Sequence, residues 1–377
     1  MIESVAELIP SLITQCQDAF TLAIENNGEL PQDRGNNPSL AVRSVIQKSK
    51  AEYSALRGNL LLMLAFHEML KSSSFKQKLV KAPFIELLAN VIEKSDQCQT
   101  NQLKQFRKAT FCVIDQMAKN AKLLNLHYTD IVEKLLPAIA SQIDSQIPEV
   151  RFDALKAFSD YVTQFMCEEK IYQPLEDTAS TQLLNELLLR KFLASYGTIL
   201  TATDPLPLLG LKLLSVIVER NPAFVLILKK LGLIQILFDY FQVGHNKFNA
   251  ATLKIIRAIV ASREIELEEL LRMDIIQKIN AIMAEFVTSN PEWCSDHLLV
   301  IMHEILHLAA ELKKKKADST VPQQVFDELL VNFSAFCKLL AESDVVSKVS
   351  DFLMVLMFLS LSLRAPATQC LPLSTSR

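Results

Sequence analysis

Residues 211–224 read Leu211-Lys-Leu-Leu-Ser-Val-Ile-Val-Glu-Arg-Asn-Pro-Ala-Phe224, and residues 228–241 read Leu228-Lys-Lys-Leu-Gly-Leu-Ile-Gln-Ile-Leu-Phe-Asp-Tyr-Phe241. Both stretches carry apolar residues at helical spacing, and a turn separates them. The pattern recurs in one register, which aligns Pro83, Gly232 and Asp274, then Ile85, Ile234 and Ile276, then Leu88, Leu237 and Ile279. The downstream copy follows after 274 − 232 = 42 residues. The pattern therefore predicts helical hairpins that repeat along the chain.

A period near 42 residues built only of helices is typical of armadillo and HEAT solenoids. One hairpin cannot bury its own apolar face, so each hairpin stacks on its neighbours. The composition agrees, because half of the 377 residues are apolar and only 7 glycines and 14 prolines interrupt them. We expect an all-α, armadillo/HEAT-like α-solenoid, a right-handed superhelix of stacked helical hairpins. Such a fold offers a binding surface rather than a reaction centre.

The segment at residues 135–158 is the most HEAT-like part of the chain. Pro148 is expected to open a helix, where the N–H that proline lacks would be unpaired in any case. Asp144 is expected in the turn before that helix. Glu149 would then face the positive end of the helix macrodipole, and the small side chain of Ala154 would let neighbouring helices approach closely.

Irregular stretches divide the chain. Residues 1–167 are predicted to form an N-terminal helical-repeat sub-array, and residues 181–363 a C-terminal one. Between them, residues 168–180 hold Pro174 and acidic residues and are predicted to form a loop. Residues 364–377 hold prolines, serines and threonines without periodicity, which predicts a disordered tail.

Charge and targeting patterns exclude several classes of protein. The chain has 39 basic and 42 acidic residues, a net charge of −3, which argues against nucleic-acid and membrane partners. Its N-terminus carries acids and lacks the unbroken apolar run of a signal peptide. The longest apolar run, residues 352–363, has 12 residues, against roughly 20 needed to cross a bilayer. We expect a cytoplasmic protein whose partners are other proteins, with no small-molecule substrate.

The seven cysteines lie at positions 16, 98, 112, 167, 294, 337 and 370, and no two of them form a CxxC pair. Cys112 lies within the apolar helical pattern Phe111-Cys-Val-Ile114. An odd number of scattered cysteines within helical patterns predicts buried free thiols in a reducing compartment.

The motif His303-Glu304-Ile305-Leu306-His307 has the spacing of a catalytic metal site. On a helix, His303 and His307 share a face and could bind zinc, with Glu304 as the general base of a metallopeptidase. However, no histidine follows at the metzincin spacing, and the apolar residues around the motif predict a packing helix. We predict a histidine pair without a catalytic role and keep the zinc-dependent metallopeptidase as the alternative.

Other catalytic signatures are missing from the sequence. It has no Gly-rich phosphate loop, no GxSxG motif and no kinase His-Arg-Asp or Asp-Phe-Gly motif. We therefore expect no cofactor and no enzymatic activity. A basic run consists of Lys313, Lys314, Lys315 and Lys316. It is predicted to be a solvated helix end, since cations suit a helix C-terminus; a docking patch for a partner protein is the alternative.

Residues 204–241 resemble the C-terminal repeat region of the Unc-51-like kinase four and Fused-type kinases. The resemblance rests on the Asp-Pro-Leu-Pro opening, the Leu-Lys-Leu-Leu helix, the Asn-Pro-x-Phe turn and the following Leu-Ile, and it extends over residues 180–312. In that family a kinase or pseudokinase domain precedes the repeats, and this chain has no counterpart of that domain. The resemblance implies a non-catalytic scaffold of the cilium or cytoskeleton, which holds a partner kinase or a microtubule-associated protein.

Overall fold

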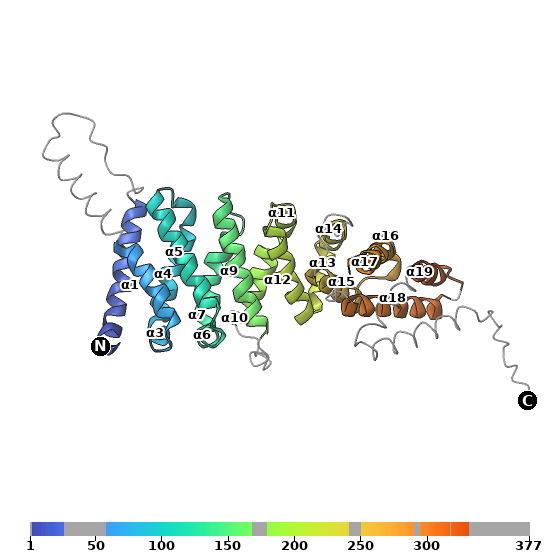
Figure 1. Ribbon diagram of the computed structural model, residues 1–377, viewed down its shortest axis with the longest axis horizontal. Coiled ribbons are helices and arrows are strands. Elements are labelled where there is room, and N and C mark those ends of the chain that lie inside the picture. Colours follow the sequence, from blue (N-terminus) through green and yellow to red (C-terminus); the bar gives the residue numbers. More distant parts are fainter. Residues whose placement is uncertain are drawn as a thin grey trace, which may run out of the picture. The chain divides into compact units, whose positions relative to one another are not determined.

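The computed structural model describes residues 2–25, 58–167, 179–240, 250–289, 295–316 and 318–331. All regular secondary structure within these ranges is helical, and successive helices stack side by side (Figure 1). The predicted all-α solenoid is therefore confirmed. None of the described helices is long and apolar enough to cross a bilayer. The apolar run at 352–363 and the predicted tail at 364–377 lie outside the described residues.

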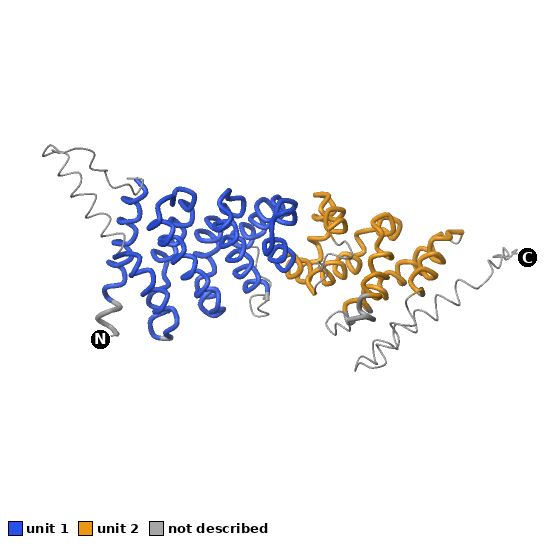
Figure 2. Tube along the Cα trace, turned by 45° about the horizontal axis from the view of Figure 1, so that its top comes forward, with its two compact units in different colours: residues 1–213 blue, residues 214–377 orange. Residues whose placement is uncertain are grey.

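The chain divides into two compact units, Met1–Leu213 and Leu214–Arg377 (Figure 2). The first unit contains, in chain order, α1 (Ile2–Glu25), a helix at residues 58–71, α3 (Ser73–Leu79), α4 (Ala82–Glu93), the 3₁₀ turn η1 (Ser95–Gln97), α5 (Asn101–Ala118), α6 (Ala121–Leu126), α7 (Tyr128–Asp130), the π-helical stretch η2 (Ile131–Leu135), α8 (Leu136–Ser141), α9 (Pro148–Cys167), α10 (Ala179–Leu187), the π-helical stretch η3 (Leu188–Leu193), α11 (Tyr196–Leu200) and the start of α12 (Leu206–Arg220).

The second unit contains the rest of α12, then α13 (Ala223–Lys230), α14 (Leu233–Tyr240), α15 (Ala250–Ser262), α16 (Leu267–Arg272), α17 (Ile275–Ser289), α18 (Ser295–Lys315) and α19 (Val321–Leu330). The sequence pattern predicts a division of the chain at a loop spanning residues 168–180. Residues 168–178 lie outside the described part of the chain, and α10 begins at Ala179. The predicted sub-array boundaries stay a prediction.

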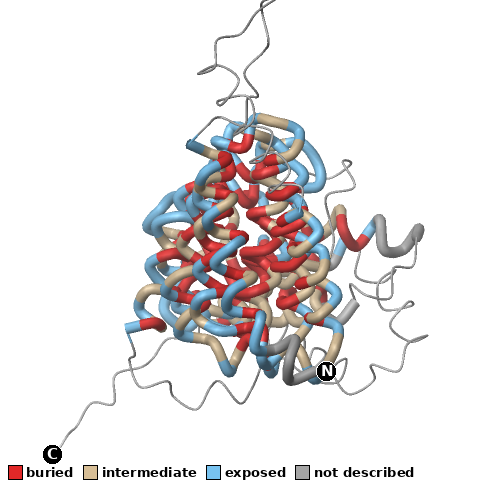
Figure 3. Tube along the Cα trace, turned by 90° about the vertical axis from the view of Figure 1, so that its left-hand side faces the viewer, coloured by how far each residue is buried: buried red, intermediate tan, exposed pale blue. Residues whose placement is uncertain are grey.

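Two rows of helices build the first unit. In one row, α4 packs against the continuous run of η2 and α8, which in turn contacts η3; in the other, α5 packs against α9. Each helix turns its apolar side toward these neighbours, so buried positions lie where helices meet and exposed ones lie outside (Figure 3). The core is thus shared between repeats, as expected when no hairpin can bury its own apolar face.

The repeat period within the first unit is longer than the 42 residues read from the sequence. Most hydrogen bonds between successive repeats join residues 47 to 51 positions apart, as from the Tyr161 hydroxyl to the Ile114 carbonyl and from Ser195 to Asp144, whereas Lys156 and Asp115 are 41 positions apart. Spacings of this size also occur in the second unit, where Arg263 donates to Glu311 and Lys316 to Glu268, each 48 positions away. The positions that the sequence aligns 42 residues apart lie in α14 and α17, which both belong to the second unit.

Aspartates in the turns between helices tie neighbouring repeats of the first unit together. Asp96 accepts a hydrogen bond of 2.6 Å from the Ser145 hydroxyl, and Asp144 accepts one of 2.7 Å from the Ser195 hydroxyl. Both bonds reach about one repeat along the chain, so the same bond recurs from repeat to repeat. Asp144 lies between α8 and α9, and Pro148 opens α9, as the HEAT-like pattern predicts.

The predicted register is confirmed at its turn positions in the second unit. Gly232 has a φ of 70° and Asp274 a φ of 55°, and each directly precedes a helix, α14 and α17. The aligned apolar positions are all buried: Ile85, Ile234, Ile276, Leu88, Leu237 and Ile279. Pro83 differs from its aligned partners because it lies in the first turn of α4, where proline fits without a left-handed residue.

Replacing Gly232 by alanine is expected to lower the free energy of unfolding by about 1–2 kcal/mol, because a Cβ is strained at positive φ. No atom lies within 4 Å of the added Cβ, so the loss would come from backbone conformation alone. Gly197 in α11 provides the control. It lies in a helix with open space around it, so alanine there should stabilise by about 0.5–1 kcal/mol. Urea unfolding followed by circular dichroism measures both, and equal effects would contradict the assignment.

Two cysteines follow the expectation of buried thiols and one does not. Cys16 and Cys98 are buried, and burial raises the pKa of the Cys16 thiol to about 12 and that of Cys98 to about 11. Cys112 is exposed, which corrects the prediction. It lies one helical turn from Lys108 on the solvent side of α5, while its neighbours Phe111 and Val113 point into the core. The side chains of the other four cysteines lie outside the described part.

Candidate functional site

A hollow of about 650 Å³ opens over the N-terminal ends of three helices of the first unit. The helices α5, α9 and α12 each close one repeat, so three successive repeats contribute side chains. Thr100 caps α5 by accepting a hydrogen bond from the Leu103 N–H at 3.4 Å. Pro148 opens α9, and the turn at residues 203–205 leads into α12. These local signals set where the three helices begin, and residues at these N-terminal ends line the same hollow.

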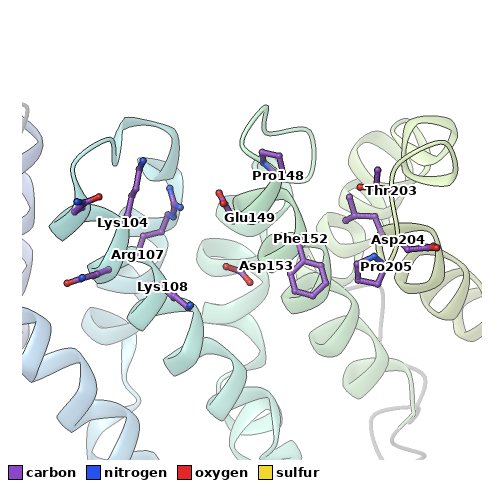
Figure 4. A pocket seen from close by; sticks show the side chains of 13 residues that line it. Lys104, Arg107, Lys108, Pro148, Glu149, Phe152, Asp153, Thr203, Asp204 and Pro205 are labelled. Atoms are coloured by element: carbon purple, nitrogen blue, oxygen red, sulfur yellow. The ribbon is translucent and has the colours of Figure 1, made fainter.

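Side chains of opposite charge face each other across part of this hollow. Lys104, Arg107 and Lys108 line it from α5, while Glu149 and Asp153 line it from α9 and point toward the α5 side (Figure 4). On the other side of α9, the partly exposed Phe152 points toward Pro205, and Asp204 lies beside that proline. The hollow therefore has a charged half and an apolar half.

Most charges that line the hollow have no partner in the described part of the protein. Arg107 is buried and donates a hydrogen bond of 3.2 Å to the Ser95 carbonyl. The other charged lining side chains form neither an ion pair nor a hydrogen bond with any described residue: Lys104, Lys108, Glu149, Asp153 and Asp204. Lysine and glutamate at exposed positions are satisfied by water, but Asp153 is only partly exposed.

Farther along α5 and α9, the charges do pair. Lys156 of α9 forms a salt bridge with Asp115 of α5 and lies 3.8 Å from Asp160 of its own helix. The same two helices thus neutralise each other in their middle and leave their charges unpaired at the hollow. This contrast marks the hollow as a distinct surface of the first unit.

The surroundings of Asp153 at the hollow shift the pKa of its carboxyl. Burial raises the pKa of its carboxyl above the ordinary value of 3.8, and the Asp115 carboxylate raises it further. Arg107, Lys156 and Lys108 act in the opposite direction without cancelling these effects. A carboxyl whose pKa is higher in the folded protein binds more protons there, so its contribution to stability falls as pH rises above 3.8.

The Asp153→Asn variant is therefore expected to be more stable than the natural chain at neutral pH. The gain should stay below about 1 kcal/mol, because the charge is partly solvated, and it should shrink as pH falls toward 4. Glu149→Gln, an exposed carboxylate in the first turn of the same helix, is the control and should lose a little stability with the macrodipole interaction. Urea unfolding between pH 4 and pH 8 measures both; a gain for Asp153→Asn that does not depend on pH would contradict the assigned cause.

The histidine motif lies on α18 of the second unit. The rings of His303 and His307 are 6.3 Å apart, and both side chains are partly exposed. Arg263 forms salt bridges with the two carboxylates beside them. Its guanidinium nitrogens lie 3.6 Å from a carboxylate oxygen of Glu304 and 3.0 Å from one of Glu311. The apolar residues of the motif pack in the core, with Ile305 and Leu306 fully buried, which confirms the predicted packing helix.

A zinc site at these histidines would need further ligands. Among the described residues, no group of three or more His, Cys, Asp or Glu side chains is placed to hold a metal ion. Glu304, the expected general base, is held by Arg263 instead. The zinc peptidase interpretation stays a prediction, and equilibrium dialysis of the natural chain and of His303→Ala against Zn²⁺ tests it.

The basic run ends α18 as predicted. Lys313, Lys314 and Lys315 form its last turn, and Lys316 follows it and lies 3.3 Å from Glu268. Docking of a partner at this run stays a prediction.

Sequence patterns did not single out the hollow. One signal for it was present: bases at 104 and 108, and acids at 149 and 153, each four residues apart. On helices, residues four apart share a face, but only the tertiary structure shows that the two pairs face one another.

Comparison with known families agrees with this repeat architecture. A family model described as the HEAT repeats of ULK4-like serine/threonine-protein kinases matches residues 39–226. Residues 39–226 form a ULK4-like HEAT-repeat region. The resemblance read from the sequence is thereby confirmed in kind, although the match covers a more N-terminal stretch than residues 180–312. The hollow at α5, α9 and α12 lies entirely within the ULK4-like region.

Similar proteins include kinases that are much longer than this chain. The serine/threonine-protein kinase RUNKEL of Arabidopsis thaliana is 24% identical over 291 residues, which cover 76% of this chain and 20% of that protein. The serine/threonine-protein kinase ULK4 of Mus musculus is 25% identical over 158 residues, covering 42% of this chain and 12% of that protein. The chain thus spans about a fifth or less of the length of these relatives. Its ULK4-like region is a helical-repeat scaffold and not the kinase domain of such proteins.

Among solved structures, an engineered protein aligns with a TM-score of 0.46 and 10% sequence identity, over 76% of this chain and 97% of that protein. A likeness of this degree adds nothing to the fold assignment, which rests on the helices themselves and on the ULK4-like match.

Proposed function

We propose that this chain is a non-catalytic scaffold that binds partner proteins along its repeat surface. One observation carries the proposal: helices of three successive repeats line a single hollow of about 650 Å³ with largely unpaired charges. Repeat proteins use such surfaces to hold other proteins, and a pocket of this size accommodates several side chains.

The partner class follows from the ULK4 and Fused-type relationship. We assign to the scaffold a cytoplasmic role in cilium and microtubule organisation, with a kinase or a microtubule-associated protein as its partner. The kinase activity in the relatives' names belongs to those longer proteins. Catalysis by this chain is not part of the proposal.

Co-sedimentation with purified microtubules, and affinity capture followed by quantitative mass spectrometry, test the role. In the first assay, the chain is expected to pellet with microtubules when a cell extract is present. In the second, microtubule proteins, ciliary proteins or kinases are expected to be enriched among the captured proteins. The matched control is the Phe158→Ala variant, whose core defect should abolish the enrichment. If captured proteins show no excess of cytoskeletal proteins or kinases over that control, the proposed role is wrong.

A further inference from the structure

The hollow of the first unit contains one charged group that its own protein leaves poorly satisfied. Asp153 is half-buried and has no hydrogen-bond donor and no ion pair among the described residues. Taking a carboxylate partly out of water without a donor costs free energy. Glu149 does not raise the same question, since it is exposed in the first turn of α9, where an acid is favourable.

The cations around Asp153 act on its carboxylate without a hydrogen bond or an ion pair to it. Lys108 is exposed to solvent, Arg107 donates a hydrogen bond to the Ser95 carbonyl, and Lys156 forms a salt bridge with Asp115. Asp115 adds like charge. A cation arriving from outside would therefore find a carboxylate with free acceptor capacity, and it would gain more there than an anion would gain at the exposed Lys104, which water already solvates.

The apolar half of the hollow lies on the other side of α9 from that carboxylate. Phe152 is partly exposed, whereas Phe158 and Phe165 of the same helix are buried. Its ring points toward Pro205 (Figure 4). Leu206 and Pro148 also line the hollow. Aromatic side chains in a concave site are the usual anchors of protein interfaces, so the ring of Phe152 offers a contact for an apolar side chain of a bound segment.

We propose that this hollow binds a segment of a partner protein that presents an arginine or lysine to Asp153 and a neighbouring apolar side chain to Phe152. The proposal rests on the scaffold function proposed above and names the site and the chemistry of the bound segment. The bound cation supplies the donors that Asp153 lacks, and the apolar side chain covers the ring of Phe152. Acidic peptides and small molecules are the competing occupants.

Selection of random 12-residue peptides displayed on phage, against the immobilised full chain, tests this assignment. The expected peptides share an arginine or lysine within a few residues of a leucine, isoleucine, phenylalanine or tryptophan. The affinity of the most enriched peptide, measured by fluorescence anisotropy, should fall at least tenfold on Phe152→Ala and on Asp153→Asn, and it should weaken as salt concentration rises.

Matched controls separate this site from the rest of the surface. Asp160→Asn removes a carboxylate of the same helix outside the hollow, and Leu126→Ala removes an apolar side chain that is 68% exposed elsewhere in the first unit. Both should change the affinity less than twofold. Circular dichroism and thermal unfolding establish that each variant is folded, and Asp153→Asn is expected to be at least as stable as the natural chain.

A charge exchange adds an independent readout. Asp153→Lys should reject the selected peptide and bind a version in which glutamate replaces its basic residue. Acidic consensus peptides, no enrichment at all, or equal binding to Phe152→Ala would each overturn the assignment. Peptides that bind with full affinity to both hollow variants would refute this site and leave the scaffold function standing, because capture of cytoskeletal proteins or kinases tests that function separately.

Discussion

Replacing Phe158 by alanine is expected to lower the free energy of unfolding of the first unit by about 3–5 kcal/mol. Phe158 is fully buried in the middle of α9, and its ring lies 6.4 Å from that of Phe192 in η3. Phe192 in turn packs edge-on against Tyr196 of α11 at 5.4 Å, so the ring of Phe158 belongs to a cluster shared by two repeats. Its removal leaves a cavity at a contact that no single repeat can close by itself.

Phe152→Ala on the same helix is the matched control for Phe158. Phe152 is partly exposed at the hollow, so its truncation should cost less than about 1 kcal/mol. Urea unfolding gives the free energies, and hydrogen exchange shows whether α9 and η3 lose protection together, as coupled neighbours in a solenoid should. Equal losses for the two variants would mean that α9 does not present these two faces.

The second large effect is expected at Leu237 in α14, where alanine should cost about 2–5 kcal/mol. Leu237 is fully buried and occupies the register position shared with Leu88 and Ile279, which are also buried. The preceding residue, Ile236, is 41% exposed. It provides a control of nearly equal size on the same helix, and alanine there should change stability by about 0.5 kcal/mol or less.

The alignment of the repeats also predicts the effect of a third variant. Ile279→Ala in α17 should behave like Leu237→Ala, since both residues pack into the second unit at equivalent positions. Urea unfolding of the three variants measures the difference. Should Ile236→Ala prove as damaging as Leu237→Ala, the alignment of the repeats would be off by one residue.

The sequence was sufficient for the fold because helical repeats are built from local signals. The apolar spacing around Leu237, the left-handed turn at Gly232 and the proline that opens α9 each act within a few residues. Stacking then follows from the unburied apolar faces. The period was less accessible, since most hydrogen bonds between repeats of the first unit span 47 to 51 residues, whereas Lys156 and Asp115 of the same unit are 41 residues apart.

The candidate site was much less accessible from the sequence. Cys112 shows the limit on a small scale: its apolar neighbours suggested burial, yet its place on the helix exposes it. The charge pattern of the hollow could not be predicted from the sequence either. Whether Lys108 and Asp153 form an ordinary salt bridge or stay apart depends on the distance between α5 and α9, and the pairing of Lys156 with Asp115 shows that both outcomes occur on these two helices.

The sequence by itself determined that this chain folds as stacked helices, where the aligned turns fall and which apolar positions of the register enter the core, because each of these is set by apolar spacing and backbone preference over a few neighbouring positions. Only the tertiary structure decided which charges meet a partner and which line an open hollow. That outcome depends on distances between helices from different repeats, and side-chain identity alone does not fix those distances.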